Sequence, residues 1–178
     1  MYIPPTVLLT CQGVNYEIER DGSFLWAPQK AKYNKPPFFY WESLSIMKAG
    51  DIILHSLQGN IVAVSEVMAQ LTEEGWQGNS TAPMPEELPN WQNIDGWLVK
   101  CEYVELSDYL PLGIFRDIIM QYKLDKYSAF DKYGDTNAGY CYILEPDIAD
   151  AIIRELLNQH HSLRKLDYLS NYARNSGR

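Results

Sequence analysis

Long apolar segments are missing from this sequence. No stretch approaches the roughly 18 uninterrupted apolar residues that a membrane-spanning helix requires. The first five residues also lack the basic flank and apolar run of a secretory signal. We therefore expect a cytoplasmic protein with no membrane partner.

Cysteine and histidine are both scarce. The cysteines stand far apart in apolar, strand-like segments without metal-ligand spacing, so we expect buried free thiols; they are Cys11, Cys101 and Cys141. His160 and His161 are neighbours near a helix end and point about 100° apart, which excludes a shared ligand face. His55 stands alone in an apolar run. The sequence therefore predicts no metal site and no cofactor.

Common catalytic motifs are absent as well. There is no Gly-rich phosphate loop with Lys and Ser or Thr, no Gly-x-Ser-x-Gly elbow and no His-Glu-x-x-His zinc helix. Carboxylates are plentiful, but none forms a spaced pair with a lysine as in a metal-dependent nuclease. We therefore assign no catalytic residues and expect a binding domain.

Basic charge is in short supply and unevenly placed. The chain has 15 basic and 23 acidic residues, a net charge of -8, which argues against a general nucleic-acid coat protein. Residues 42–95 hold one basic and eight acidic residues, or -7, whereas residues 1–41 hold four basic and three acidic residues, or +1. A nucleic-acid site would therefore have to draw its affinity mainly from a pocket.

The length of 178 residues suits one domain. We assign residues 1–160 to it and read residues 161–178 as a basic linker or tail toward a missing effector domain. Runs of β-branched and aliphatic residues predict strands over 6–11, 51–57, 60–67, 97–106 and 139–144. The second and third of these strands are expected to form a hairpin, joined by Gln58-Gly59-Asn60. Helical spacing predicts helices over 114–122 and 146–158, and a Gly- and Pro-rich loop is expected over 73–93.

Aromatic residues are abundant, with 5 Trp, 13 Tyr and 5 Phe. Most are expected to fill the core. Two tryptophans differ, because Trp26 precedes and Trp41 follows a loop that carries Lys30, Lys32 and Lys35. Rings beside a small basic cluster are what is needed to stack a base and hold its phosphates.

An ordered set of motifs resembles a known family. The set is Cys11-Gln12-Gly13, Tyr16, Asp21-Gly22-x-x-Leu25-Trp-Ala-Pro28, Tyr40-Trp41, Lys48-Ala-Gly-Asp-Ile-Ile-Leu-His55, Ile61-Val-Ala-Val-Ser-Glu-Val67, Gly96-Trp97 and Asn137-Ala-Gly-Tyr140. From Val7 to Leu157 the chain resembles the EVE-type domains of the PUA-like superfamily. The likeness is greatest to those at the N-terminus of modification-dependent (type IV) restriction endonucleases, which are fused to an HNH nuclease or a McrB-like GTPase.

This resemblance implies an α+β fold, a PUA-like (EVE) curved β-barrel with flanking helices, that accepts a modified base in an aromatic pocket. It suggests Trp26 and Trp41 as stacking residues. The first-loop wall would be Gln12, Gly13 and Tyr16, and the polar readers would be Asp51, His55 and Ser65. Phosphates would meet Lys30, Lys32, Lys35 and Lys48. Three of these assignments have structural alternatives: Asp51 as a cap of the turn after Gly50, His55 as a satisfied core histidine, and Ser65 as merely a small residue.

The resulting hypothesis is a sensor that flips a modified base, with modified cytosine favoured, out of double-stranded DNA. It would target an HNH nuclease or a McrB-like GTPase in cis or in trans, as part of phage defence. A reader of modified RNA, like YTH or PUA domains, is the alternative. An ASCH-like nucleoside hydrolase or deaminase using Lys48 and Asp51 ranks last. The sequence leaves a homodimer open.

Overall fold

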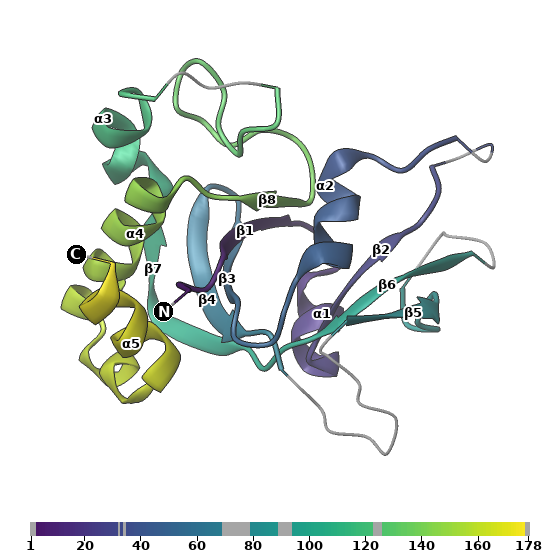
Figure 1. Cartoon of the computed structure of the whole chain (residues 1–178), viewed down its shortest axis with the longest axis horizontal. Coiled ribbons are helices and arrows are strands. Elements are labelled where there is room, and N and C mark those ends of the chain that lie inside the picture. The colour runs from purple at the N-terminus through teal and green to yellow at the C-terminus, as the bar shows by residue number, and fades with distance from the viewer. Residues whose placement is uncertain are drawn as a thin grey trace.

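Two β-sheets form the centre of the computed structural model, which describes residues 3–31, 33, 35–68, 79–88, 94–122 and 126–176 (Figure 1). The larger sheet is mixed, in the order β7-β4-β3-β1-β8. Its strands are β1 (Val7–Gln12), β3 (Ile52–Leu57), β4 (Asn60–Glu66), β7 (Val104–Pro111) and β8 (Cys141–Ile143). Only β1 and β3 pair in parallel among these neighbours. The smaller sheet is antiparallel, in the order β2-β6-β5, with β2 (Phe24–Pro28), β6 (Asp95–Lys100) and β5 (Asn79–Pro83).

Helices flank both sheets. They are α1 (Tyr16–Gly22), α2 (Phe39–Glu42), η2 (Ser43–Ile46), η3 (Leu112–Phe115), α3 (Arg116–Ile119), α4 (Pro146–Gln159), η4 (His161–Lys165) and α5 (Asp167–Asn175). In Figure 1 the C-terminal helices, in yellow and green, lie on the side of the larger sheet away from the smaller sheet. The expected α+β class with flanking helices is confirmed.

The core divides along the faces of the sheets. One cluster lies between α4 and the larger sheet and includes Leu9, Leu54 and Ile152. A second joins the two sheets through Leu8, Ile53, Leu25 and Val99. A third, the β2 outer cluster, consists of buried Phe24, Trp26 and Leu88 with the partly buried Ile18, Met84, Ile94 and Leu98. Because β2 residues alternate between faces, Leu25 and Trp26 face different clusters.

Several predicted elements are confirmed. The hairpin forms, with β3 and β4 joined at Gln58 and Gly59, whose φ angles of 50° and 76° suit a tight two-residue hairpin turn. The helix after Pro146 also forms, and Pro146 lies in its first turn, where a missing N–H costs nothing. Its buried positions, such as Ile148 and Ile152, follow the expected helical spacing.

Other predictions need correction. The segment 97–106 is not one strand: β6 and β7 belong to different sheets and separate at Cys101–Tyr103. The helix over 114–122 is a 3-10 turn followed by the four-residue α3. The expected loop over 73–93 contains β5, which pairs with β6, while residues 73–78 and 89–93 lie outside the described residues.

The segment read as a basic tail is folded up to Asn175. Residues of η4 and α5 pack against α4, and the apolar side chains of Leu163, Leu169 and Tyr172 are buried in its cluster. The sequence interpretation overlooked these three anchors among the charged residues. The expectation of an effector domain beyond this segment stays a prediction. Within the described ranges, no helix has the length and apolarity to cross a bilayer.

Candidate functional site

Gln12 lies at the centre of a buried polar network at the end of β1. Its Nε2 donates hydrogen bonds to Glu19 Oε2 (2.6 Å) and to the Tyr103 hydroxyl (3.0 Å). Its Oε1 accepts from Thr10 Oγ1 (3.2 Å) and faces His55 Nδ1 at 2.9 Å. Because the Glu19 carboxylate and the Tyr103 hydroxyl accept hydrogen bonds from Gln12, the amide atom that faces them is Nε2, which fixes the orientation of the Gln12 amide. All the polar atoms of the Gln12 side chain are therefore paired inside the protein.

His55 is fully buried and its ring nitrogens are both paired. Because Gln12 Oε1 only accepts, Nδ1 carries the proton, and Nε2 accepts from Ser65 Oγ at 2.6 Å. The Tyr103 ring stacks on the imidazole at 3.8 Å between centroids. Burial lowers the pKa of His55 to about 3, so the ring is neutral at pH 7. His55 and Ser65 thus support the network and do not reach a ligand in this arrangement.

Glu19 links this network to Trp26. The carboxylate of this buried α1 residue accepts hydrogen bonds from the Tyr140 hydroxyl, the Gln12 amide and the backbone N–H of Trp26. Burial raises the pKa of Glu19 to about 7, and the three hydrogen bonds oppose this shift. An ionisable group therefore fixes the backbone from which the Trp26 ring projects.

Trp26 is held by its neighbours in the β2 outer cluster. Its ring lies over Gly96 on the paired strand, where a Cβ would come within 2.3 Å of Trp26 Cε2. The side chain is only 5% exposed. A base can therefore stack on Trp26 only if half-buried side chains of the cluster, such as Met84 and Ile94, give way.

Asn15 is a candidate that the sequence interpretation missed. It precedes α1 at the position where asparagine normally caps the helix, yet its side chain makes no capping hydrogen bond. Its Oδ1 is shielded from solvent and has no hydrogen-bond partner. One helical turn later, Ile18 packs in the β2 outer cluster and Glu19 holds the Trp26 N–H. The sequence signal that could have identified this residue is an asparagine placed between the first strand and α1.

The structure does not bring Trp41 to Trp26. Trp41, on α2, packs half-buried at the edge of the cluster between the sheets, on the opposite face of β2 from Trp26. Its ring meets Phe38 edge to face at 4.8 Å and Tyr40 at 6.0 Å. One base cannot contact both tryptophans in this arrangement.

The other predicted residues are spread around these groups. Tyr16 is buried with its hydroxyl 3.3 Å from Glu105 Oε1, and Gly13 is exposed at the end of β1. Asp51 accepts backbone N–H groups of Thr6 (2.9 Å) and Lys48 (2.8 Å), which matches the alternative of a turn cap. The Lys30, Lys35 and Lys48 side chains are exposed, and Lys32 lies outside the described residues.

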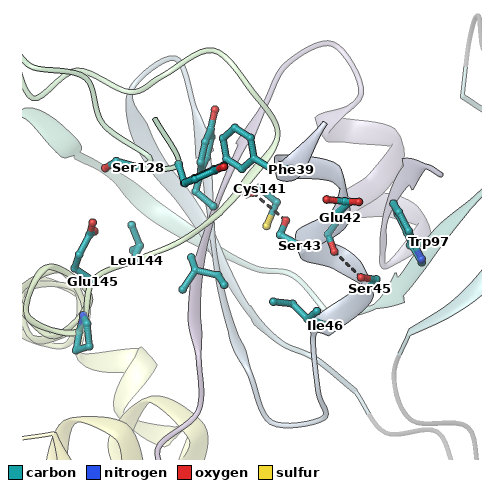
Figure 2. Close-up of a pocket in the computed structure, with 14 residues that line it drawn as sticks. Phe39, Glu42, Ser43, Ser45, Ile46, Trp97, Ser128, Cys141, Leu144 and Glu145 are labelled. Atoms are coloured by element: carbon teal, nitrogen blue, oxygen red, sulfur yellow. Dashed lines mark hydrogen bonds between the residues drawn. The ribbon is translucent and has the colours of Figure 1, made fainter. Parts of the chain in front are cut away.

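Two cavities flank Phe39 and Tyr142. The larger, about 680 Å³, is bounded by α2, η2, β8 and the start of α4 (Figure 2). The smaller, about 330 Å³, is lined by aromatic rings together with Lys126 and Lys132. Tyr142 occupies space left by Gly139, where a Cβ would come within 1.9 Å of its hydroxyl.

Metal-binding groups are not found in the described part of the chain: no three His, Cys, Asp or Glu side chains gather there. All three cysteines are free; Cys101 and Cys141 are buried as expected, whereas Cys11 is only partly buried.

Comparison with known proteins finds no matching protein-family profile and no matching curated protein. The resemblance to EVE-type domains therefore stays a prediction. Among solved structures, the chain is similar to the Pho92 YTH domain in complex with m6A, at 13% identity over 87% of this chain and 86% of that chain, with a TM-score of 0.47. It is also similar to the YTH domain of the Zygosaccharomyces rouxii MRB1 protein in complex with N6-methyladenosine RNA, at 9% identity over 87% and 90%, with a TM-score of 0.47.

Proposed function

We propose that this chain is a non-catalytic reader that receives one modified nucleobase beside Trp26. The observation that carries the proposal is the unpartnered, shielded Oδ1 of Asn15, the residue before α1, one helical turn ahead of Ile18, which packs in the β2 outer cluster. A buried acceptor without a donor costs about 1–3 kcal/mol, which a bound N–H group would recover. The Watson–Crick edges of bases carry such N–H donors.

The apolar neighbours supply the remaining recognition. Stacking on an aromatic ring contributes about 1–3 kcal/mol per base, which offsets the few kcal/mol needed to unstack it. Partly buried Met84 and Ile94 would meet a methyl substituent, for which a preference of roughly 10- to 200-fold is typical. Stacking, the amide acceptor and methyl contact together favour a modified base over an unmodified one.

Duplex DNA with a modified cytosine is our first candidate strand, on the resemblance to EVE-type domains. An HNH nuclease or McrB-like GTPase would then be the partner. Four phosphate contacts, by Lys30, Lys32, Lys35 and Lys48, would give a slope of about -3.6 for log affinity against log salt.

Modified RNA is the second candidate, and exposed Lys–Tyr pairs favour it. Lys126 lies 4.7 Å from the centre of the Tyr127 ring and Lys132 lies 4.9 Å from that of Tyr133, and both rings are more than half exposed. Exposed rings with adjacent cations suit unpaired bases and their phosphates.

The hydrolase alternative gains nothing from the structure. The Asp51 carboxylate is taken up by two backbone N–H groups, and the Lys48 side chain is exposed. The two groups do not form the acid and amine pair that such a reaction needs.

Fluorescence anisotropy with a matched panel tests the proposal. The panel holds duplexes with methylcytosine, hydroxymethylcytosine, glucosylated cytosine or methyladenine, and an RNA with N6-methyladenosine, each beside its unmodified twin. We expect one modified strand to bind at least roughly tenfold tighter than its twin. Trp26→Ala should weaken that binding by roughly 5- to 150-fold, whereas Trp41→Ala, the matched control on the other face, should not.

Two Asn15 variants distinguish recognition of the modified base from general affinity for the strand. Asn15→Ala should lower the preference for the modified strand, and Asn15→Asp, which retains an acceptor, should keep it. Equal binding of every modified strand and its twin by the folded wild-type chain would contradict the proposal.

A further inference from the structure

The larger cavity lies apart from the site proposed at Trp26. Trp97 lines it, and Trp97 pairs with Ala27 on β2 while its neighbour Leu98 pairs with Trp26. Since successive strand residues point to opposite faces, the cavity lies on the face of the smaller sheet away from Trp26. A ligand there would not contact Trp26, although Tyr127, which the RNA alternative uses, also lines this cavity.

The charged residues lining this cavity are both acidic. Glu42 comes from the end of α2 and Glu145 from the position before α4, and Figure 2 shows them on opposite sides. No ion pair within the described part of the chain includes either carboxylate. Glu145 Oε2 is shielded from solvent and has no hydrogen-bond partner. The following residue is Pro146, which has no N–H to donate to it.

Apolar groups lie between the two carboxylates. Phe39, Ile46 and Leu144 line the cavity between the walls that carry Glu42 and Glu145 (Figure 2). Aromatic faces attract cations, and methylene groups pack well on such side chains. Lys126 already lies over the neighbouring Tyr127 ring, so a bound cation is expected at the carboxylates and not at Tyr127.

We propose that this cavity binds an aliphatic diamine or polyamine. One ammonium group would pair with Glu42 and another with Glu145, and the methylene chain would lie along Phe39 and Ile46. The ligand then brings opposite charge to a cavity whose lining holds two carboxylates and no basic side chain.

Calorimetric titration of the full chain tests this proposal. The probes are α,ω-diamines of increasing chain length, spermidine, and n-butylamine as the monoamine. We expect an optimum chain length, at which the diamine binds roughly tenfold or more tighter than the monoamine. Glu42→Gln and Glu145→Gln should each weaken the best diamine by roughly tenfold, while Glu102→Gln, an exposed acid in the turn before β7, should not.

Methyl NMR of the wild-type chain supplies a readout that needs no variant. Shifts of the Ile46 and Leu144 methyl groups on adding the diamine would support the cavity as the site. The proposal is overturned if the diamine binds no tighter than the monoamine, if both glutamine variants bind like the wild type, or if a nucleoside displaces the diamine from these methyl groups. Binding of the best modified duplex, measured alongside, should stay unchanged in both variants, because Trp26 lies on the other face of the smaller sheet.

Discussion

Replacing Glu19 by glutamine should change how the stability of the fold depends on pH. Burial raises the pKa of Glu19 from its ordinary value of 4.5 to about 7. The folded chain therefore binds this proton more tightly than the unfolded chain does. The contribution of Glu19 to stability is then highest below pH 4.5, falls as the pH rises toward 7, and levels off above it.

The magnitude follows from the size of the shift. Each unit of pKa corresponds to about 1.4 kcal/mol, so the carboxyl of Glu19 should remove roughly 3 kcal/mol of stability between pH 4.5 and pH 8. Glutamine does not ionise. It retains one oxygen that can accept hydrogen bonds, where the Glu19 carboxylate now accepts them from Tyr140, Gln12 and Trp26. The difference in unfolding free energy, wild type minus Glu19→Gln, should therefore fall by roughly that amount.

Urea denaturation at closely spaced pH values measures this difference directly. Other titrating groups contribute to both proteins and cancel to first order. Glu17→Gln, an exposed residue of the same helix, is the control and should give a difference that hardly varies with pH. A wild-type minus Glu19→Gln difference that stays constant from pH 4.5 to 8 would refute the assignment of a raised pKa.

Three further perturbations test other parts of the structure. Burial lowers the pKa of His55 to about 3, so this residue should remove roughly 3 kcal/mol of stability as the pH falls from 6.5 to 4. ¹⁵N NMR should still show a neutral His55 ring, protonated at Nδ1, at pH 5. A ring that titrates near pH 6.5 would contradict this. Gly96→Ala should destabilise the fold by roughly 1–3 kcal/mol or more in urea, because its Cβ would collide with Trp26, whereas Gly113→Ala meets nothing and should be tolerated. Leu169→Ala should cost roughly 2–5 kcal/mol because α5 is part of the core, and an unchanged denaturation midpoint would instead indicate a dispensable tail.

The sequence predicted correctly the hairpin and the long helix, which are specified by residues close together in the chain. The two-residue turn at Gln58 and Gly59 and the apolar spacing after Pro146 specify a hairpin and a helix with little tertiary information. The division of 97–106 could not be read in the same way, because both halves are β-rich. It depends on which sheet each half joins and on Tyr103 turning toward Gln12.

The sequence predicted which residues come together at the candidate site better than it predicted what each residue does there. Gln12, His55 and Ser65 do come together, but as a satisfied network and not as an open pocket, because pairing partners on four separate elements become visible only in three dimensions. Asn15 escaped notice because its significance lies in a missing hydrogen bond. A sequence does not show which caps are left unused.

The central claim is that affinity comes from a base-reading site and not from phosphate attraction. The most direct test is the ratio of affinities for the best modified strand and its unmodified twin, measured at two salt concentrations. We predict that both affinities fall with salt while their ratio stays at roughly 10- to 200-fold, because phosphate contacts are common to both strands and the base contacts are not. A ratio of one at both salt concentrations would contradict the account.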